Sequence, residues 1–320
     1  SGIAAAKEAA DKKLDVILVE QDNLLGGDEL SENNFNSDSI YSELCSLGIR
    51  VMKRTTAFGL YDNSVLGLVE RLTDHIPPDN NELPRQRFWI VRAKHVIVGS
   101  GALERHIAFN NNDIPGSMTV NASKHYLNRY GVLTGKEIVI ATNNDSVYLT
   151  AENLSNAGAK VTVLDSRAKV NLELNDTNFE VKFGTVPYNI NGSRQIQSLD
   201  IADSTTSPFK KIGTILCDQV LMSGGWSPVV HLLSHRGERP VWNSQNLCFL
   251  PGDTKENITM IGSARGIWKK EDCIKSGVAG ALEAVNRLGI SQTNYFFPKQ
   301  GGWQNAIEPL YEVKYNKSRS

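Results

Sequence analysis

The chain has 320 residues, of which 40% are hydrophobic and 22% are charged, a composition typical of a globular protein of about two domains. The formal net charge of −1 provides no long-range field for nucleic acid or an anionic membrane, and no apolar run approaches the roughly 20 residues that span a bilayer. We therefore predict that neither nucleic acid nor a membrane is a partner. The four cysteines have no C-x-x-C spacing, which argues against a zinc site or a redox dithiol and favours a reducing, cytoplasmic location.

The first part of the chain reads as an incomplete βαβ unit. A helix is predicted over residues 3–10, and the apolar run DVILVE predicts a buried parallel strand over residues 15–20. A helix at 39–47, a strand pair and a β-meander follow, and HVIVGSG at residues 95–101 predicts a further buried strand. Because the helix comes first, we expect the first strand of the unit to lie before Ser1.

A second strand–turn–helix–strand unit begins at residue 136 with the strand KEIVIA and ends with the strand AKVTVLDSR at residues 159–167. Several strands follow, then a last apolar strand, NITMIGSARG, and a long helix predicted over 271–288. This order predicts an α/β fold with two dinucleotide-binding, Rossmann-like domains of the glutathione/thioredoxin-reductase type, the second inserted in the first.

The predicted domain boundaries follow from this arrangement. The first dinucleotide-binding domain comprises residues 1–116 and 241–289, and the inserted domain comprises residues 117–240. Residues 290–320 form a tail without clear periodicity, which we expect to lead into a further C-terminal domain.

The first βαβ unit carries half of a dinucleotide fingerprint. In such a fingerprint, glycines let the backbone approach a pyrophosphate at a helix N-terminus, and an acid about 20 residues later holds the ribose hydroxyls. Gly2 stands at the place of the last glycine, and Glu20 stands at the place of the acid. The alternative for Glu20 is a solvated charge at a strand end. We expect the first two glycines to precede Ser1.

The corresponding turn of the second unit, TNNDS, contains no glycine. Asn143 and Asn144 would crowd a pyrophosphate and Asp145 would repel it, whereas Asp145 or Ser146 could cap the following helix. We predict that the inserted domain keeps the fold without binding a second dinucleotide. This prediction argues against a pyridine-nucleotide:flavin reductase or a disulfide reductase.

The last strand favours NAD over FAD in the first domain. Flavin enzymes of this architecture have Gly-Asp at the end of that strand, and here Gly262 is followed by Ser263. The other polar groups are weaker candidates. His231 and His235 have a spacing that could chelate a metal but more simply are surface or core residues, and the cluster after GSGAL, Glu104–His106, is as readily an ion pair between domains as a catalytic group. We predict no catalytic residue and no metal site.

Four segments together carry a family resemblance: RAKHVIVGSGALERHIAFNNNDIPGSMT, YLNRYGVLTGKEIVIATNNDSVY, GGWSPVVHLLSHRG and GSARG. They resemble the α subunit of heterotetrameric sarcosine oxidase, and the similarity runs from Gly2 to about Trp303. Opine oxidase and hydrogen cyanide synthase subunits are looser relatives. The resemblance implies that this chain is a fragment of a longer subunit, with a small β-rich domain before it and a tetrahydrofolate-binding domain after it.

The same resemblance implies a multi-subunit oxidoreductase acting on the CH–NH group of donors. That complex converts sarcosine to glycine, with formaldehyde or methylene-tetrahydrofolate and hydrogen peroxide as the other products. FAD lies in the β subunit, which takes the small secondary amine substrate; FMN lies at the α/β interface; a non-catalytic NAD lies in the α subunit. The partners would be the β, γ and δ subunits, and this fragment alone would be inactive.

The family motif also assigns contacts to residues of this chain. Glu20 and Gln21 would hold the adenosine ribose, and the backbone of Ala57 would lie by the adenine. At Asp28 the family more often has Thr or Ser. Two alternatives remain: a subunit of an FAD-dependent opine or amine dehydrogenase, and a nucleotide-binding assembly scaffold. The expected cofactor-binding residues are Gly2, Glu20, Gln21, Gly26, Gly27, Asp28, Ala57, Gly262, Ser263 and Ala264.

Overall fold

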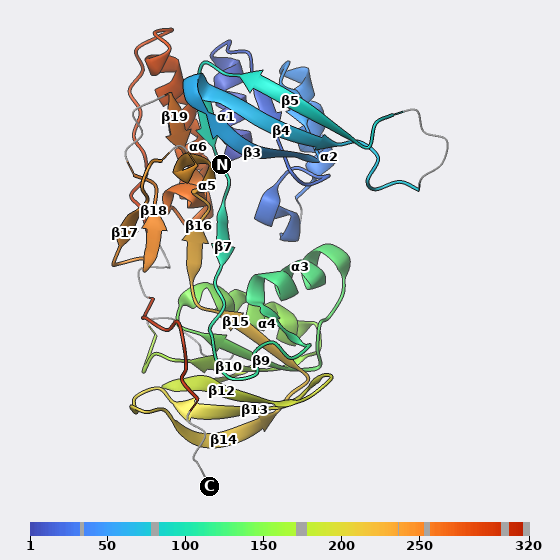
Figure 1. The fold of residues 1–320 in the computed structure, drawn as a ribbon, viewed down its shortest axis with the longest axis vertical. Coiled ribbons are helices and arrows are strands. Elements are labelled where there is room, and N and C mark those ends of the chain that lie inside the picture. Colours follow the sequence, from blue (N-terminus) through green and yellow to red (C-terminus); the bar gives the residue numbers. More distant parts are fainter. Residues whose placement is uncertain are drawn as a thin grey trace. The chain divides into compact units, whose positions relative to one another are not determined.

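The computed structural model describes residues 1–32, 35–77, 83–170, 178–235, 237–252, 257–301 and 307–315 (Figure 1). The chain divides into two compact units. Unit 1 comprises Ser1–Ala102, Pro228–Asn243 and Phe249–Gly302. Unit 2 comprises Leu103–Ser227, Ser244–Cys248 and Trp303–Ser320.

The main segment of unit 2 begins and ends earlier than the boundaries at 117 and 240 expected from the sequence. Ile107 and Phe109 are buried in the hydrophobic core of unit 2, together with Leu310 and Val313 from the predicted tail. Burial of these four side chains assigns residues 103–116 and part of the tail to this unit. Residues 302–306 and 316–320 of that tail lie outside the described residues.

Unit 1 combines short parallel strand pairs, an antiparallel meander and packed helices. Strand β1 pairs with β2 in parallel, β6 pairs with β19 in parallel, and β3, β4 and β5 form the antiparallel meander seen in blue and cyan in Figure 1. Its elements are α1 (Gly2–Asp11), β1 (Ile17–Val19), η1 (Gly27–Ser31), α2 (Ser37–Ser46), β2 (Arg50–Met52), β3 (Thr55–Tyr61), η2 (Asp62–Ser64), β4 (Val65–Arg71), β5 (Gln86–Arg92), β6 (Val96–Val98), α5 (His231–Ser234), β17 (Val241–Asn243), β19 (Ile258–Met260), η4 (Gly262–Arg265) and α6 (Lys270–Arg287).

Small residues bring α1 against α6. Helix α1 is Ala-rich, which favours the helix and leaves a narrow buried face at Ala5, Ala6 and Ala9. A methyl group added at Gly277 of α6 would meet the Ser1 carbonyl and lie 3.1 Å from the Ala4 methyl. Glycine at that point therefore allows the long helix to lie directly against the first turn of α1.

Unit 2 contains a parallel sheet with strand order β11-β10-β9-β15-β8 and an antiparallel sheet with order β12-β13-β14. Strand β9 is buried on both faces, because Ile138 and Ile140 join the cluster around helices α3 and α4 while Val139 and Ala141 join the cluster against β12 and β13. This double burial accounts for the uninterrupted apolar run of the strand. The elements are β8 (Ser117–Thr119), α3 (Val120–Tyr130), β9 (Glu137–Thr142), η3 (Asp145–Val147), α4 (Tyr148–Asn156), β10 (Lys160–Asp165), β11 (Glu180–Phe183), β12 (Thr185–Gly192), β13 (Ile196–Asp203), β14 (Lys210–Leu216) and β15 (Gln219–Ser223).

Three further strands contain or adjoin the points where the chain passes from one unit to the other: β7 (Ala102–Glu104), β16 (Trp226–Pro228) and β18 (Cys248–Leu250). The helices predicted over 3–10, 39–47 and 271–288 are present in the structure within about two residues of those bounds. In the part of the chain that the structure describes, no helix combines the length and apolarity needed to cross a bilayer.

Candidate dinucleotide site

The start of α1 offers backbone donors at the place where the fingerprint puts the phosphates. The first intrahelical bond runs from the Ala5 amide to the Ser1 carbonyl at 3.0 Å, and the Ser1 side chain makes no capping bond. The amides before Ala5 therefore have no acceptor within the helix. The first turn contains no acidic side chain that would oppose an anion. Gly2 is the first residue of this turn.

Glu20 follows β1 and is fixed by its own backbone. Its amide donates to the Met52 carbonyl at 2.9 Å, and its carbonyl accepts from the Thr55 amide at 2.8 Å. Its Oε1 accepts from the Asp22 amide at 2.9 Å. The Glu20 carboxylate is therefore held half-buried at the carboxyl end of β1, where α/β folds bind ligands.

Gln21 and Ala57 lie on either side of this connection. Gln21 is exposed, and its carbonyl accepts from Arg71 Nη2 at 2.5 Å. Ala57 is half-buried in β3, two residues after Thr55, whose amide bonds to Glu20. Ala57 therefore lies near Glu20 along the chain of contacts, because the start of β3 is hydrogen-bonded to the Glu20 carbonyl.

The loop after β1 contains two glycines with positive φ. Gly26 has φ of 139°, and a methyl group there would lie 2.5 Å from Phe35 Cε1. Gly27 has φ of 61° with no neighbouring atom within 4 Å of an added methyl group, so its surroundings are open. Asp28 is exposed in the first turn of η1, and the next residue, Glu29, forms an ion pair with Lys270 at the start of α6.

The turn after β19 is shaped by Gly262, which has φ of 62°. Its amide donates to Ser276 Oγ at 3.1 Å, and a methyl group at this position would meet the Ser1 side chain. Ser263 is half-buried beside it. Ala264 is fully buried, and its side chain packs in the core cluster of unit 1.

Two glycines that sequence reasoning did not select complete the site. An ideal Cβ at Gly99 would lie 3.4 Å from Ser1 Oγ and from Ile261, and one at Gly101 would lie 4.0 Å from Ser263 Oγ. Because β6 pairs in parallel with β19, the loops after the two strands meet at the start of α1. The sequence shows these glycines as part of VGSG at the end of a buried strand. It does not show that this strand pairs with β19, because strand pairing depends on the tertiary structure.

This arrangement presents backbone amides and one carboxylate, groups that suit ligand binding. Gly99 and Gly262 approach the Ser1 side chain, Gly2 follows Ser1 in the chain, and Glu20 directly follows β1. Burial raises the pKa of the nearby Cys273 thiol, whose Sγ donates to the Ile267 carbonyl at 3.0 Å, so this thiol stays protonated. Within the described ranges, no group of three or more His, Cys, Asp or Glu side chains could hold a metal ion.

The equivalent place in unit 2 is filled by protein side chains. Asp165 ends β10 and is fully buried; it accepts from Tyr148 Oη at 2.6 Å and from Arg167 Nε at 2.9 Å and Nη2 at 2.6 Å. Arg167 Nη1 also pairs with Asp145 in the preceding turn at 2.7 Å. Burial and the negative charge of Asp165 raise the pKa of Tyr148, so the phenol remains a donor.

The turn itself is also closed. Asn144 is fully buried, and its Oδ1 accepts from the Ser146 amide at 3.1 Å while its Nδ2 donates to the Ser223 carbonyl at 3.1 Å. The capping residue is therefore Asn144, and the expectation of a cap by Asp145 or Ser146 was wrong. The capping bond to Ser146 is local, whereas the second partner, Ser223, lies on a different strand, so the burial of Asn144 could not be inferred from the local sequence.

The remaining polar candidates have structural partners. Glu104 Oε2 accepts from the Asn121 amide at 2.7 Å, and Arg105 donates to the carbonyls of Gly224 at 2.9 Å and Leu247 at 2.5 Å. These bonds lie within unit 2, so the idea of an ion pair between domains gains no support. His235 Nδ1 donates to the Leu60 carbonyl at 3.0 Å within unit 1.

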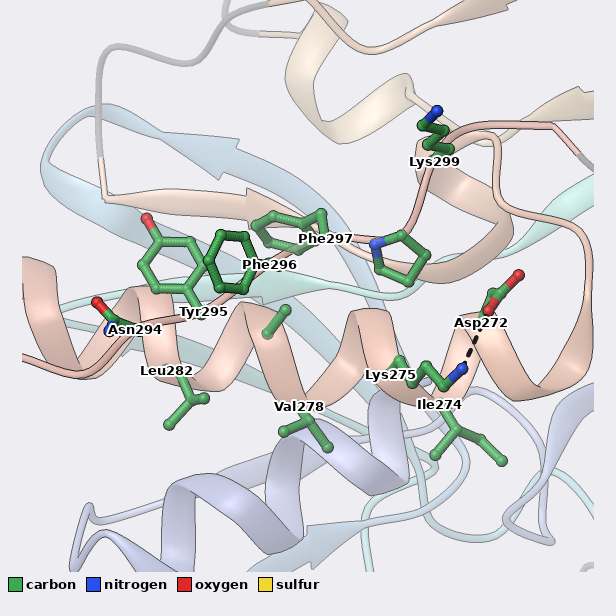
Figure 2. Close-up of a pocket in the computed structure, with 12 residues that line it drawn as sticks. Asp272, Ile274, Lys275, Val278, Leu282, Asn294, Tyr295, Phe296, Phe297 and Lys299 are labelled. Carbon is green, nitrogen blue, oxygen red and sulfur yellow. Dashed lines mark ion pairs between the residues drawn. The ribbon is translucent and has the colours of Figure 1, made fainter.

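A cavity of about 630 Å³ lies along α6, beside the aromatic segment Tyr295–Phe297 (Figure 2). Its wall is mainly apolar, and the dashed line in Figure 2 marks its ion pair, Asp272–Lys275, at 3.6 Å. None of the residues expected to bind a cofactor lines this cavity. The candidate site therefore lies at the carboxyl ends of β1, β6 and β19, not in this cavity.

Comparison with known proteins agrees with this architecture. The chain is similar to an L-proline dehydrogenase from P. horikoshii, with a TM-score of 0.65 and 17% identity over 93% of this chain and 54% of that chain. It is equally similar to the thioredoxin reductase of Lactococcus lactis, with a TM-score of 0.65 and 17% identity over 90% of this chain and 94% of that chain. These likenesses confirm the predicted Rossmann-like fold.

Sequence comparison is more specific. The α subunit of sarcosine oxidase from Rhizobium meliloti is 34% identical over 91% of this chain and 30% of its own length. That of Corynebacterium sp. strain U-96 is 30% identical over 91% of this chain and 32% of its own length. No family model matches the chain. The chain thus spans about a third of these curated relatives. Over the region that it spans, the chain belongs to the family of sarcosine oxidase α subunits.

Proposed function

We propose that this chain is the NAD-binding region of a sarcosine oxidase α subunit, with no complete active site of its own. The observation that carries the proposal is the contrast between the two strand-end loops. In unit 1, Gly27 is open and the amides at the start of α1 have no helical acceptor. In unit 2, Arg167 and Tyr148 saturate the strand-end carboxylate. This contrast supports a single dinucleotide site, in unit 1.

The residues of unit 1 fit a dinucleotide. Gly262 leaves no room for a side chain beside Ser1, so backbone and not side chains forms this wall of the site. The Gly2 turn would donate to the pyrophosphate, and the Glu20 carboxylate would accept from ribose hydroxyls. Gln21, Gly26 and the Ala57 backbone would lie along the adenosine half, Asp28 near the phosphates, and Ser263 along the far half.

Ser263 supports NAD as the occupant. An acidic residue at this turn would favour a flavin's ribityl chain, and the small neutral hydroxyl of Ser263 provides no carboxylate there. In the wider proposal, FAD and FMN reside elsewhere in the complex, tetrahydrofolate binds a C-terminal domain, and the β, γ and δ chains are partners. The reaction of the complex would be the oxidative demethylation of sarcosine in a reducing cytoplasm, which the free cysteines suit.

The test is identification of the cofactor bound to the full-length α subunit. After denaturation, chromatography and mass spectrometry should find about one NAD per chain and no flavin in the isolated α subunit. A stoichiometric flavin in the NAD position would contradict the assignment and favour an FAD-dependent opine or amine dehydrogenase subunit, a class suggested by 25% identity to an opine oxidase subunit of Rhizobium meliloti. If no cofactor is found, the chain would be better explained as an assembly scaffold of the complex.

A second measurement addresses the absence of an active site. We expect the isolated α subunit to produce no hydrogen peroxide from sarcosine, because the described residues of its candidate site include no nucleophile or base positioned for chemistry. Sarcosine-dependent peroxide from the isolated chain would overturn this part of the proposal.

A further inference from the structure

The solvent side of the β3-β4-β5 meander is apolar. Side chains of an antiparallel sheet alternate between its two faces, and the solvent face is ordinarily polar. Here Phe58, Phe88 and Ile90 are 50%, 70% and 80% exposed, respectively. Phe58 and Phe88 contact each other edge to face, with ring centroids 6.2 Å apart. This meander face (Phe58, Tyr61, Phe88 and Ile90) is therefore one patch.

Paired glycines make the patch flat. Gly59 and Gly67 stand opposite each other on β3 and β4. A methyl group at Gly67 would lie 2.5 Å from Phe58 Cζ, and one at Gly59 would lie 2.7 Å from Tyr61 Oη. Each ring therefore lies down over a glycine and cannot do so over a larger residue. The result is a flat aromatic surface.

The opposite face of the same sheet packs against the hydrophobic core of unit 1. Leu60 is fully buried and Leu68 is 1% exposed. On that face Trp89 Nε1 donates to Glu70 Oε2 at 2.8 Å. Because the buried face already anchors the meander, folding does not require apolar side chains that are 70–80% exposed on the other face. Exposed apolar patches of this kind mark interaction surfaces.

Charge decides what kind of partner fits. By strand alternation Arg71 and Arg92 stand on the meander face, and the acidic residue of these strands, Glu70, points to the opposite face. No residue of β3, β4 or β5 puts a carboxylate on this face, so two copies would bring arginines together, which disfavours self-association. A different polypeptide with an apolar centre and carboxylates at its rim would complement both features.

We infer that the meander face is the docking surface for another polypeptide, apolar at its centre and acidic at its rim. Its identity as one of the other oxidase subunits rests on the proposed function, but the surface itself is argued from unit 1 alone. A flat surface suits a protein, because small molecules are bound in concave sites.

The test uses the full α chain, tagged and co-expressed with the β, γ and δ chains of the same source. The variant Phe88→Thr/Ile90→Thr keeps β-favouring residues at two exposed positions. The matched control, Ile212→Thr/Leu216→Thr, changes two apolar side chains of β14 that are 57% and 75% exposed. We expect the Phe88→Thr/Ile90→Thr variant to co-purify with partner chains at a level at least about tenfold below the wild type. The control should match the wild type, and both variants should keep the wild-type unfolding temperature.

The inference is overturned if the Phe88→Thr/Ile90→Thr variant retains partner chains at the wild-type level, or if the wild type retains none. Sedimentation of the isolated α chain provides another check, since a dimer that this variant dissolves would make a second copy the occupant. NAD is measured on the same preparations. Loss of partner by this variant from a complex without NAD would contradict the nucleotide assignment and leave the docking surface standing.

Discussion

The two units solve the same local problem in opposite ways. Each has a strand that ends in an acid, Glu20 in unit 1 and Asp165 in unit 2. Glu20 is half-buried and its Oε1 accepts from the Asp22 amide of its own turn. Asp165 is fully buried and accepts from Tyr148 and from the Arg167 guanidinium. The same topological position thus serves as a candidate ligand site in one unit and as an internal ion-pair network in the other.

What separates the two outcomes is the identity of a few neighbours. In the loop that follows the first acid, Gly27 leaves open space, with no atom within 4 Å of an added methyl group. Arg167, two residues after the second acid, bridges Asp165 and the turn residue Asp145. A retained acid at a strand end is therefore no indication of nucleotide binding unless the turn facing it is open.

The largest effect that this comparison predicts is on the stability of unit 2. Replacing Arg167 with Met would leave the buried carboxylate of Asp165 and the half-buried carboxylate of Asp145 without their cation, at a cost of about 3–5 kcal/mol in the free energy of unfolding. Urea unfolding followed by circular dichroism measures it. The triple variant Arg167→Met/Asp165→Asn/Asp145→Asn, which removes the charges together, should recover much of the loss. A single variant as stable as the wild type would show that the network is not structural.

Much of this contrast could be predicted from the sequence. The glycine-free turn TNNDS predicted that side chains would crowd this position, and in the structure the Asn144 and Arg167 side chains fill the turn. The two apolar strands and the long final helix were identified from composition and length. The spacing between Gly2 and Glu20 located the end of β1 as a candidate site, and the structure places both in unit 1.

The remainder depends on tertiary neighbours. Nothing near Arg167 in the sequence shows that its guanidinium turns back to Asp145. Ala264 follows two turn residues and reads as part of the loop, yet it packs in the core. Gly99 and Gly101 gain their role only because β6 lies beside β19, and strand adjacency is not encoded in a local pattern.

The second prediction compares two glycines of unit 1 with nearly the same backbone conformation. Gly262 and Gly27 have φ of 62° and 61°, so alanine costs about 1 kcal/mol of conformational strain at either. Only at Gly262 would the new methyl group also meet the Ser1 side chain, which adds about 1–3 kcal/mol of overpacking. Thermal unfolding should therefore show a clearly larger loss for Gly262→Ala than for Gly27→Ala. Equal losses would mean that the wall beside Ser1 can move.

The third prediction replaces the strand-end acid of each unit with its amide. Glu20→Gln should weaken NAD binding by about 10- to 100-fold, the equivalent of a charge-assisted hydrogen bond, with little change in unfolding. Asp165→Asn should do the reverse, destabilising unit 2 while leaving NAD affinity unchanged. Isothermal titration of nucleotide-free protein with NAD, together with urea unfolding, measures both. Weaker NAD binding by Asp165→Asn would contradict the assignment of a single site to unit 1.

The last prediction concerns a half-buried histidine that supports the loops of unit 1. His95 Nε2 lies 2.9 Å from Thr259 Oγ1, and that hydroxyl donates to Glu283 Oε2 at 3.0 Å. Because the single hydroxyl proton goes to the carboxylate, the histidine must donate through Nε2, which leaves Nδ1 unprotonated, and Nδ1 is buried without a partner among the described residues. The network ties β6, which leads into Gly99, to β19 and α6.

Burial, together with the positive charge of Arg287, lowers the pKa of His95 from 6.5 to about 4. The unfolded chain therefore takes up a proton first as the pH falls, so the stability tied to neutral His95 is fully present above about 6.5 and is lost toward pH 4. Between pH 7.5 and 5 the linked loss is about 2 kcal/mol. His95→Gln keeps a donor toward Thr259 and cannot titrate, so amide exchange of α6 should lose this part of its pH dependence in the variant. If the wild type and the variant change in parallel, protonation of His95 does not control the stability of the loops that unit 1 offers to a dinucleotide, and the contrast with unit 2 rests on the glycines and Arg167 alone.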